Sequence, residues 1–269
     1  MTRLATGTER IAEAFAAARA EGRRAALMPY LMGGFPDLDT SRAIGHACAR
    51  GGADLLELGV PFSDPLADGP VIHAAGTAAL RRGTRVEDVI EVARELAREV
   101  PVIVMCYANP IFARGSERFA DMLVDAGVSG LIVPDLPLEE SSKLLEVCDA
   151  RGLALVPLLA PTTPPDRLAR IGAQARGFLY AVSLTGTTGE RSALDPGSLA
   201  ALLSGAAAHS PVPVVVGFGI GTPEQARKAV AAGAQGVIIG SRLVRAAGEA
   251  EDPAAAVEDL VRGFAAALG

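Results

Sequence analysis

The fold of this chain is indicated by a stretch that reads Gly51-Gly52-Ala53-Asp54-Leu55-Leu56-Glu57. The same order of features returns at residues 126–132 and 232–238. Each copy has glycine where a helix would stop, then a tight turn, and then the start of an apolar strand. A unit of this kind that recurs along a chain predicts alternating helices and strands, with the strands parallel.

Counting outward from these stretches gives eight short apolar runs with helical patterns between them. The runs are 26–32, 55–58, 102–107, 130–133, 154–159, 178–182, 212–218 and 236–239, and helices are expected at 86–99, 116–126, 139–150 and 223–232. Eight parallel strands are the number that closes a barrel. No linker or low-complexity tract interrupts the pattern. We therefore predict an α/β protein in which residues 1–269 form a single (β/α)8 TIM-barrel domain.

Two additions to the plain barrel are expected. An amphipathic helix precedes Arg24 and is placed to cap the bottom of the barrel. An extra helix, from about residue 71 to 82, follows the second strand and a long loop. Loops of this length inside a compact domain are usually functional.

Composition narrows the function and the compartment. Half of the residues are hydrophobic, and the net charge of −6 argues against a nucleic-acid partner, whose binding surface is normally basic. The N-terminus lacks a signal-peptide core, and no apolar run is long enough to span a membrane. The 3 cysteines form no Cys-x-x-Cys pair and are expected to be buried thiols. These features predict a cytoplasmic protein with a small-molecule substrate.

Three carboxylates lie in the run from Leu55 to Pro70. Glu57 ends an apolar strand, and Asp64 and Asp68 follow in the loop. A buried acid is costly unless it is hydrogen-bonded or used in chemistry, and carboxylates in different surroundings can divide acid and base roles. Active sites of such barrels lie at the C-terminal ends of the strands, where this run falls. It is a catalytic candidate, although Glu57 could also be a salt-bridged strand-end acid.

Glycines at the ends of the last two strands indicate a phosphate site. Gly217 and Gly219 follow the seventh strand, and Gly240 and Ser241 follow the eighth. Backbone N–H groups can approach an anion closely there, and a helix that begins at Ser241 adds its dipole. The segment 186–191 follows the sixth strand and could close over the same group. Simple turn geometry is the alternative interpretation of the glycines.

The sequence does not favour metal or Schiff-base chemistry. His46, His73 and His209 are scattered and are expected away from the barrel mouth, so we predict no metal site. The lysines are Lys143 and Lys228, and neither ends a barrel strand. Carbon–carbon chemistry in this chain would therefore depend on carboxylates.

The run from Leu56 to Pro70 resembles the signature of the tryptophan synthase alpha chain family. Weaker matches in the family's order are Tyr107-Ala108-Asn109-Pro110, Val133-Pro134-Asp135-Leu136-Pro137, Gly217-Phe218-Gly219-Ile220 and Gly240-Ser241. The resemblance runs from about residue 26 to residue 269. It implies a lyase of tryptophan biosynthesis that splits indole-3-glycerol phosphate into indole and glyceraldehyde 3-phosphate. It also implies an alpha2beta2 heterotetramer with a beta chain, which would carry the pyridoxal phosphate, and no cofactor in this chain.

The resemblance also implies roles for single residues. Glu57 would protonate C3 of the indole and take the proton of the adjacent hydroxyl, and Asp68 would accept a hydrogen bond from the indole N–H. Asp64 is expected to shape the loop. Substrate contacts are expected from Tyr30, Tyr107, Tyr180, Thr188 and Phe218. Phosphate contacts are expected from Gly189, Gly219, Gly240 and Ser241.

Three other functions remain open at this point. The chain could be a stand-alone lyase that releases free indole, for which the same residues would serve. It could be a non-catalytic barrel that activates the beta chain, although the presence of both Glu57 and Asp68 argues against that. A related phosphate-binding barrel that isomerises or closes indole precursors would lack the run from Leu56 to Pro70.

Overall fold

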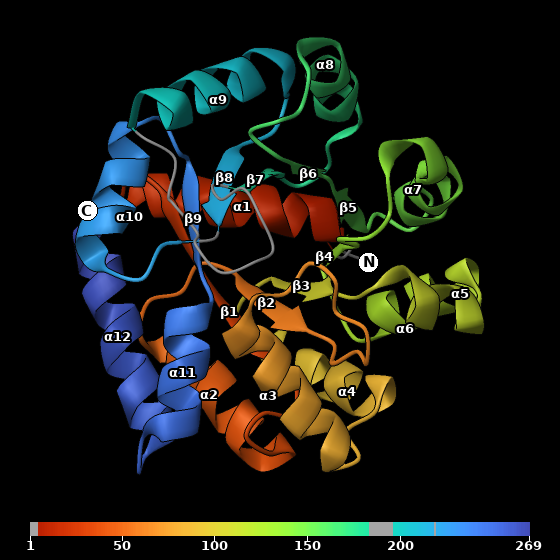
Figure 1. The fold of residues 1–269 in the computed structure, drawn as a ribbon, viewed down its shortest axis with the longest axis vertical. Helices are drawn as coiled ribbons and strands as arrows, with labels where there is room; N and C mark the ends of the chain where they lie inside the picture. The colour runs from red at the N-terminus through yellow and green to blue at the C-terminus, as the bar shows by residue number, and fades with distance from the viewer. Residues whose placement is uncertain (1–4, 183–195, 218) are drawn as a thin grey trace.

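The computed structural model describes residues 5–182, 196–217 and 219–269. Its strands form one parallel sheet in the order β5-β4-β3-β2-β1-β9-β8-β7-β6 (Figure 1). Their bounds are β1 Ala26–Met32, β2 Leu56–Gly59, β3 Val102–Met105, β4 Gly130–Ile132, β5 Ala154–Val156, β6 Leu158–Leu159, β7 Leu179–Val182, β8 Val214–Gly217 and β9 Gly236–Ile239. The predicted barrel is confirmed.

The sheet closes through one expected strand that the structure divides in two. The run 154–159 is broken at Pro157, so β5 pairs with β4, whereas β6 pairs with β7. Proline has no N–H to donate and interrupts a ladder of hydrogen bonds. Its carbonyl still accepts the N–H of Tyr180 over 3.1 Å, which links the two edges of the sheet.

Side chains alternate between the two faces of the barrel wall. Leu27 and Leu31 of β1 pack outward in the core shared with the surrounding helices. Met28, Tyr30 and Met32 point inward and belong to a separate cluster that fills the barrel. Because successive side chains of a strand face opposite sides, this alternation determines which residues can reach the interior.

Helices surround the sheet (Figure 1). They are α1 Gly7–Ala20, α2 Leu38–Arg50, α3 Pro70–Arg81, α4 Val86–Leu96, α5 Ala108–Arg114, α6 Ser116–Asp125, η1 Leu138–Glu140, α7 Ser142–Asp149, α8 Pro165–Gln174, α9 Pro196–His209, α10 Pro223–Ala231, α11 Ser241–Glu249 and α12 Pro253–Ala267. The helix expected at 139–150 is thus a short 3-10 turn followed by α7. No helix in the described ranges is long and apolar enough to cross a membrane.

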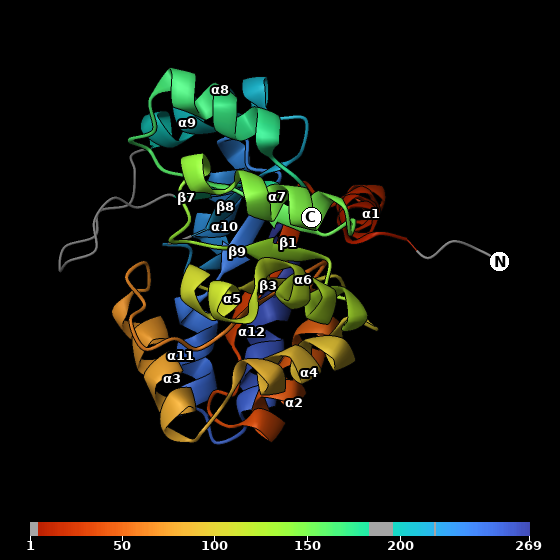
Figure 2. The ribbon, with the colours of Figure 1, turned by 90° about the vertical axis from the view of Figure 1, so that its right-hand side faces the viewer.

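Helix α1 covers the end of the barrel where the strands begin. Its Ile11 and Phe15 are buried in the interior cluster. A Cβ on Gly177, just before β7, would lie 2.9 Å from Ile11, and one on Gly236, at the start of β9, would lie 3.2 Å from Phe15. Figure 2 shows α1 on the opposite side of the sheet from the loop that leads into α3. The expected N-terminal cap and the extra helix after the second strand are both present.

Candidate active site

Glu57 lies inside the barrel and has no hydrogen-bond partner among the described residues. It lies on β2, two positions after Leu55, which directly precedes the strand and belongs to the interior cluster, so both side chains face inward. The residue is 0 % exposed, and neither carboxyl oxygen bonds to any atom of the described residues. Burial, reinforced by the charge of Asp68, raises the pKa of Glu57 to about 8. The salt-bridge alternative is therefore not found in the described part of the chain.

Asp68 lies on the loop between β2 and α3. Burial raises its pKa to about 6, and a hydrogen bond donated by the Tyr107 hydroxyl over 3.1 Å acts in the opposite direction. The charge of His73, in the first turn of α3, also lowers this pKa. His73 lies on α3 as expected, is exposed and lines neither cavity, so its influence on Asp68 is electrostatic only. The two carboxyls thus have different affinities for a proton.

Asp64 lies on the same loop but faces solvent. Its carbonyl accepts the N–H of Leu66 over 3.0 Å, and Asp68 donates its N–H to the carbonyl of Pro65 over 3.1 Å. These bonds form a turn that brings Asp68 back toward the barrel. The position of Asp64 in the turn is consistent with a role in shaping the loop.

Each of two tyrosines of the site rests against the glycine that ends the adjacent strand, Tyr30 of β1 against β2 and Tyr180 of β7 against β8. A Cβ on Gly59 would lie 2.2 Å from the hydroxyl of Tyr30, and one on Gly217 would lie 2.2 Å from that of Tyr180. Real side chains essentially never approach so closely, so any larger residue would displace the ring. Both tyrosines are buried, at 5 % and 2 % exposure, and belong to the interior cluster.

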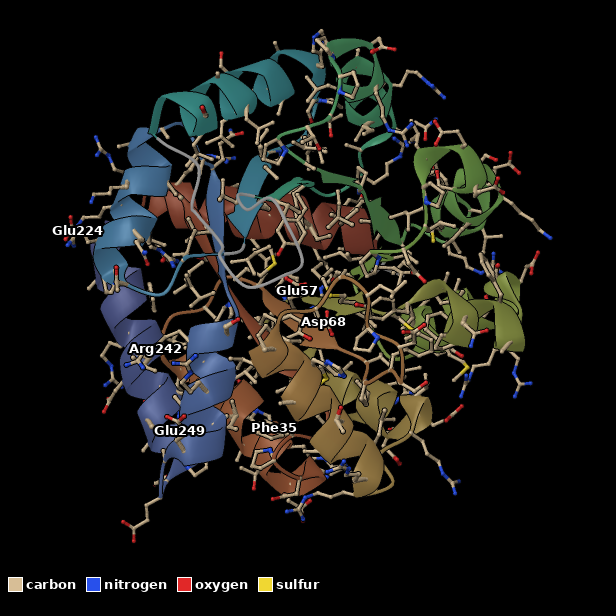
Figure 3. The ribbon with its side chains drawn as sticks, viewed as in Figure 1. Phe35, Glu57, Asp68, Glu224, Arg242 and Glu249 are labelled. Atoms are coloured by element: carbon tan, nitrogen blue, oxygen red, sulfur yellow. The ribbon has the colours of Figure 1, made fainter. Side chains whose placement is uncertain are left out.

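A cavity of about 400 Å³ joins the two carboxyls to the glycine-rich strand ends. Of the predicted residues, the cavity is lined by Tyr30, Glu57, Asp68, Tyr180, Gly219, Gly240 and Ser241. Figure 3 places Glu57 and Asp68 together near the centre of the view, and Arg242 on α11. Gly240 is the N-cap of α11, so the helix begins at the cavity wall. Thus the structure brings together both ends of the predicted site.

Three predicted residues, Thr188, Gly189 and Phe218, lie outside the described residues. Tyr107 is described but does not line the cavity. Its hydroxyl instead donates a hydrogen bond to the carboxylate of Asp68, which does line the cavity. Its contact with a substrate remains a prediction.

The cavity also contains residues that the sequence analysis did not identify. Arg242 and Arg245 line it near Gly240 and Ser241, together with Gln225. Neither arginine forms an ion pair with a carboxylate of the described residues. Their spacing of three, directly after Gly240-Ser241, was a usable signal because residues three apart share a helix face.

A second cavity, of about 520 Å³, adjoins the first. Asp68 and Met105 line both cavities. Beyond them the second cavity is lined by the loop after β4, by β5 and β6, and by α7 and α8. Most of its lining is aliphatic or proline, including Pro134, Leu138 and Leu158. An apolar space therefore begins at the Asp68 carboxylate.

No group of three histidine, cysteine, aspartate or glutamate side chains among residues 5–182, 196–217 and 219–269 is arranged to hold a metal ion. The groups assembled around the cavity are instead carboxyls, tyrosines and a helix N-terminus. This set can transfer protons and bind an anion.

Comparison with known proteins identifies the family. The family model described as tryptophan synthase alpha chain matches residues 15–267. The chain belongs to the tryptophan synthase alpha chain family. It is 50 % identical over 236 residues to the tryptophan synthase alpha chain of Synechococcus elongatus, which covers 87 % of this chain and 88 % of that relative. As a member of this family, the protein is a lyase of tryptophan biosynthesis.

Solved structures of the family agree with the fold. A structure of Mycobacterium tuberculosis tryptophan synthase superposes with a TM-score of 0.88 at 38 % identity, over 96 % of this chain and 98 % of that one. The tryptophan synthase alpha subunit of Legionella pneumophila superposes with a TM-score of 0.86 at 36 % identity, over the same shares. The similarity to the alpha chain family thus extends over nearly the whole barrel.

Proposed function

We propose that this chain cleaves indole-3-glycerol phosphate into indole and glyceraldehyde 3-phosphate. The observation that carries the proposal is a cavity lined by Glu57, by Asp68 and by the start of α11. The carboxyl of Glu57 is buried there and has no hydrogen-bond partner among the described residues. Such a cavity accommodates a substrate with an aromatic amine at one end and a phosphate at the other. The family membership supports the same reaction.

Glu57 is proposed as the proton carrier. Cleavage of the bond between C3 of the indole and the glycerol carbon requires a proton on C3. It also requires removal of the proton from the neighbouring hydroxyl, as that carbon becomes an aldehyde. With a pKa of about 8, Glu57 holds a proton at neutral pH and can donate it first. The carboxylate that results can then accept the hydroxyl proton, so that one group performs both transfers.

Asp68 is proposed to stabilise the positive charge that develops on the indole ring. With a pKa of about 6 it is largely ionised at neutral pH, and its carboxylate can accept a hydrogen bond from the indole N–H. Tyr30 and Tyr180 would enclose the substrate, with Thr188 and Phe218 as further contacts, and Tyr107 would act on it through Asp68. The phosphate would be bound by backbone N–H groups of Gly189, Gly219, Gly240 and Ser241, with positive charge from Arg242.

The proposal is tested by incubating the chain with indole-3-glycerol phosphate and following indole release. Glu57→Gln should lower the turnover at least about 100-fold, the usual contribution of a general acid–base group. Binding of glycerol 3-phosphate, measured by calorimetry, should be unchanged because its site lies at the other end of the cavity. Near-normal turnover in Glu57→Gln would refute the assignment, and absence of indole release by the wild-type chain would refute the reaction.

A beta chain is proposed as the partner, in an alpha2beta2 heterotetramer. The exposed apolar side chains of Leu66, at 69 %, and Phe112, at 53 %, support a docking surface at the barrel mouth. They lie on neighbouring elements, because Ala67 bonds the hydroxyl of Tyr107, the N-cap of α5. The second cavity begins at Asp68 and would give released indole an apolar path toward that partner. Pyridoxal phosphate would be bound by the beta chain alone.

The cytoplasm is the proposed compartment, since Cys48, Cys106 and Cys148 are buried free thiols. The alternative of a stand-alone lyase uses the same residues. Titration with a cognate beta chain separates the two: strong activation of indole release supports the synthase subunit. Full activity of the isolated chain supports the stand-alone enzyme.

A further inference from the structure

The Tyr107 side chain contacts the Asp68 loop at three points. Its hydroxyl donates to Oδ1 of Asp68 over 3.1 Å and accepts the backbone N–H of Ala67 over 3.1 Å. Its ring stacks on that of Phe62, with the centroids 5.1 Å apart and the planes at 24°. One side chain from the end of β3 therefore holds both the backbone and the carboxylate of this loop.

Tyr107 is itself fixed in place. It is 3 % exposed and is the N-cap residue of α5. The next residue, Ala108, donates its N–H to Oδ1 of Asp135 over 2.8 Å, which ties the start of α5 to the loop after β4. Tyr107 does not line the cavity, so its contacts are with the loop and not with the open space.

We propose that Tyr107 is a positioning residue that orients the Asp68 carboxylate toward the indole N–H of the substrate. This inference rests on the proposed function and deepens it. The hydroxyl binds Oδ1, and no bond to Oδ2 is found among the described residues, so the second oxygen is available to the substrate. A carboxylate on a loop becomes a preorganised acceptor when a rigid donor fixes its rotation.

The same hydrogen bond favours the charged form of Asp68. It lowers a pKa that burial has raised, and its loss should raise that pKa further above about 6. The titratable groups around Asp68 come from every neighbouring element. They are Glu57 on β2, Tyr30 on β1, Tyr180 on β7, Tyr107 after β3 and His73 on α3.

Tyr107→Phe is the decisive variant because it keeps the ring and its stacking on Phe62 and removes only the hydroxyl. We expect kcat/KM for indole-3-glycerol phosphate to fall roughly ten- to hundredfold near neutral pH, the range for loss of a hydrogen bond to a charged group. The acid-side inflection of the kcat/KM profile, which reports the free enzyme, should move to higher pH. That position does not depend on the amount of folded enzyme.

Two further variants separate a positioning role from a structural one. In an Asp68→Asn background, Tyr107→Phe should have less than about a threefold further effect, because its route to the reaction is already removed. Tyr30→Phe, which loses a hydroxyl that does not bond Asp68, should leave the acid-side inflection in place. An unmoved inflection in Tyr107→Phe, or an undiminished effect in the Asp68→Asn background, would overturn the inference. Absence of turnover by the wild-type chain would instead refute the proposed reaction.

Discussion

At the scale of single residues, the chemistry of this protein depends on where a carboxyl is buried. Glu57 has no hydrogen-bond partner among the described residues, and burial raises its pKa to about 8. Burial also raises the pKa of Asp68, but the hydrogen bond from Tyr107 acts in the opposite direction, so this pKa rises only to about 6. Two acids on the same cavity therefore have different protonation states at neutral pH, which is the condition for divided roles.

Burial of Glu57 should also make the stability of the fold depend on pH. Below about pH 4.5 the residue is protonated in both the folded and the unfolded chain, so there is no penalty. As the pH rises toward about 8, the unfolded chain releases the proton while the folded protein retains it, and folding is progressively disfavoured. The Glu57→Gln variant lacks this dependence.

We therefore expect Glu57→Gln to gain stability relative to the wild type as the pH increases. Over the full interval the gain should be on the order of 3–5 kcal/mol, from the size of the pKa shift. Urea unfolding of both proteins at about pH 4.5 and about pH 9 measures it. A constant difference between the two proteins across this range would mean that Glu57 is ionised in the folded state.

At the scale of elements, strand ends and side chains are fitted to one another. Gly59 ends β2 beneath the Tyr30 hydroxyl, and Gly217 ends β8 beneath that of Tyr180. These glycines are required by close approach and not by turn geometry. The barrel thus leaves room at two strand ends for the rings that enclose the cavity.

Gly59→Ala should displace Tyr30, because its Cβ would lie 2.2 Å from the hydroxyl. Overpacking of this kind typically costs about 1–3 kcal/mol of stability, and the shifted ring should raise the KM for the substrate. Gly263→Ala is the matched control, since a Cβ at that position on α12 meets nothing within 4 Å. Thermal unfolding and steady-state kinetics of both variants measure the effect; equal behaviour would show that Tyr30 moves freely.

The periodic features of the fold were predictable from the sequence. Apolar runs located all eight barrel strands, and helix-stopping glycines located the turns before three of them, because both signals are local. The inward direction of Glu57 also follows from its spacing of two from Leu55. The division of one strand at Pro157 was readable from the proline but was not predicted.

Contacts between distant segments could not be predicted in this way. The bond from Tyr107 to Asp68 joins residues 39 positions apart, and no local pattern specifies it. The charge of His73 near Asp68 depends on how α3 lies against the barrel, which the helix pattern alone does not indicate. These long-range contacts determine how each acid of the site behaves.

At the scale of the whole molecule, the two ends of the barrel have different surfaces. One end is covered by α1, whereas Leu66, next to Ala67 of the second cavity, and Phe112 on α5 are exposed. Large exposed apolar side chains on neighbouring elements can mark an interaction site. The proposed beta chain would therefore bind at the mouth.

Phe112→Asp should weaken binding of a cognate beta chain at least about tenfold. An aromatic side chain that the partner would bury is replaced by a charge. Val124→Asp is the control, because Val124 is another exposed apolar residue, at 39 %, near the end of α6 and away from the mouth. Half-saturation in a titration of beta chain against indole release measures both variants. Equal half-saturation for the two would place the partner on another surface.

The interruption at Pro157 links the wall of the second cavity to a strand of the first. Residues 154–156 pair with β4, and residues 158–159 pair with β7. The pairing partner therefore changes at Pro157. Val156, Pro157 and Leu158 are also part of the wall of the second cavity. At this point of the wall, the carbonyl of Pro157 accepts the N–H of Tyr180. The second cavity thus shares Pro157 with the hydrogen bond that holds β7, the strand that carries Tyr180 of the first cavity.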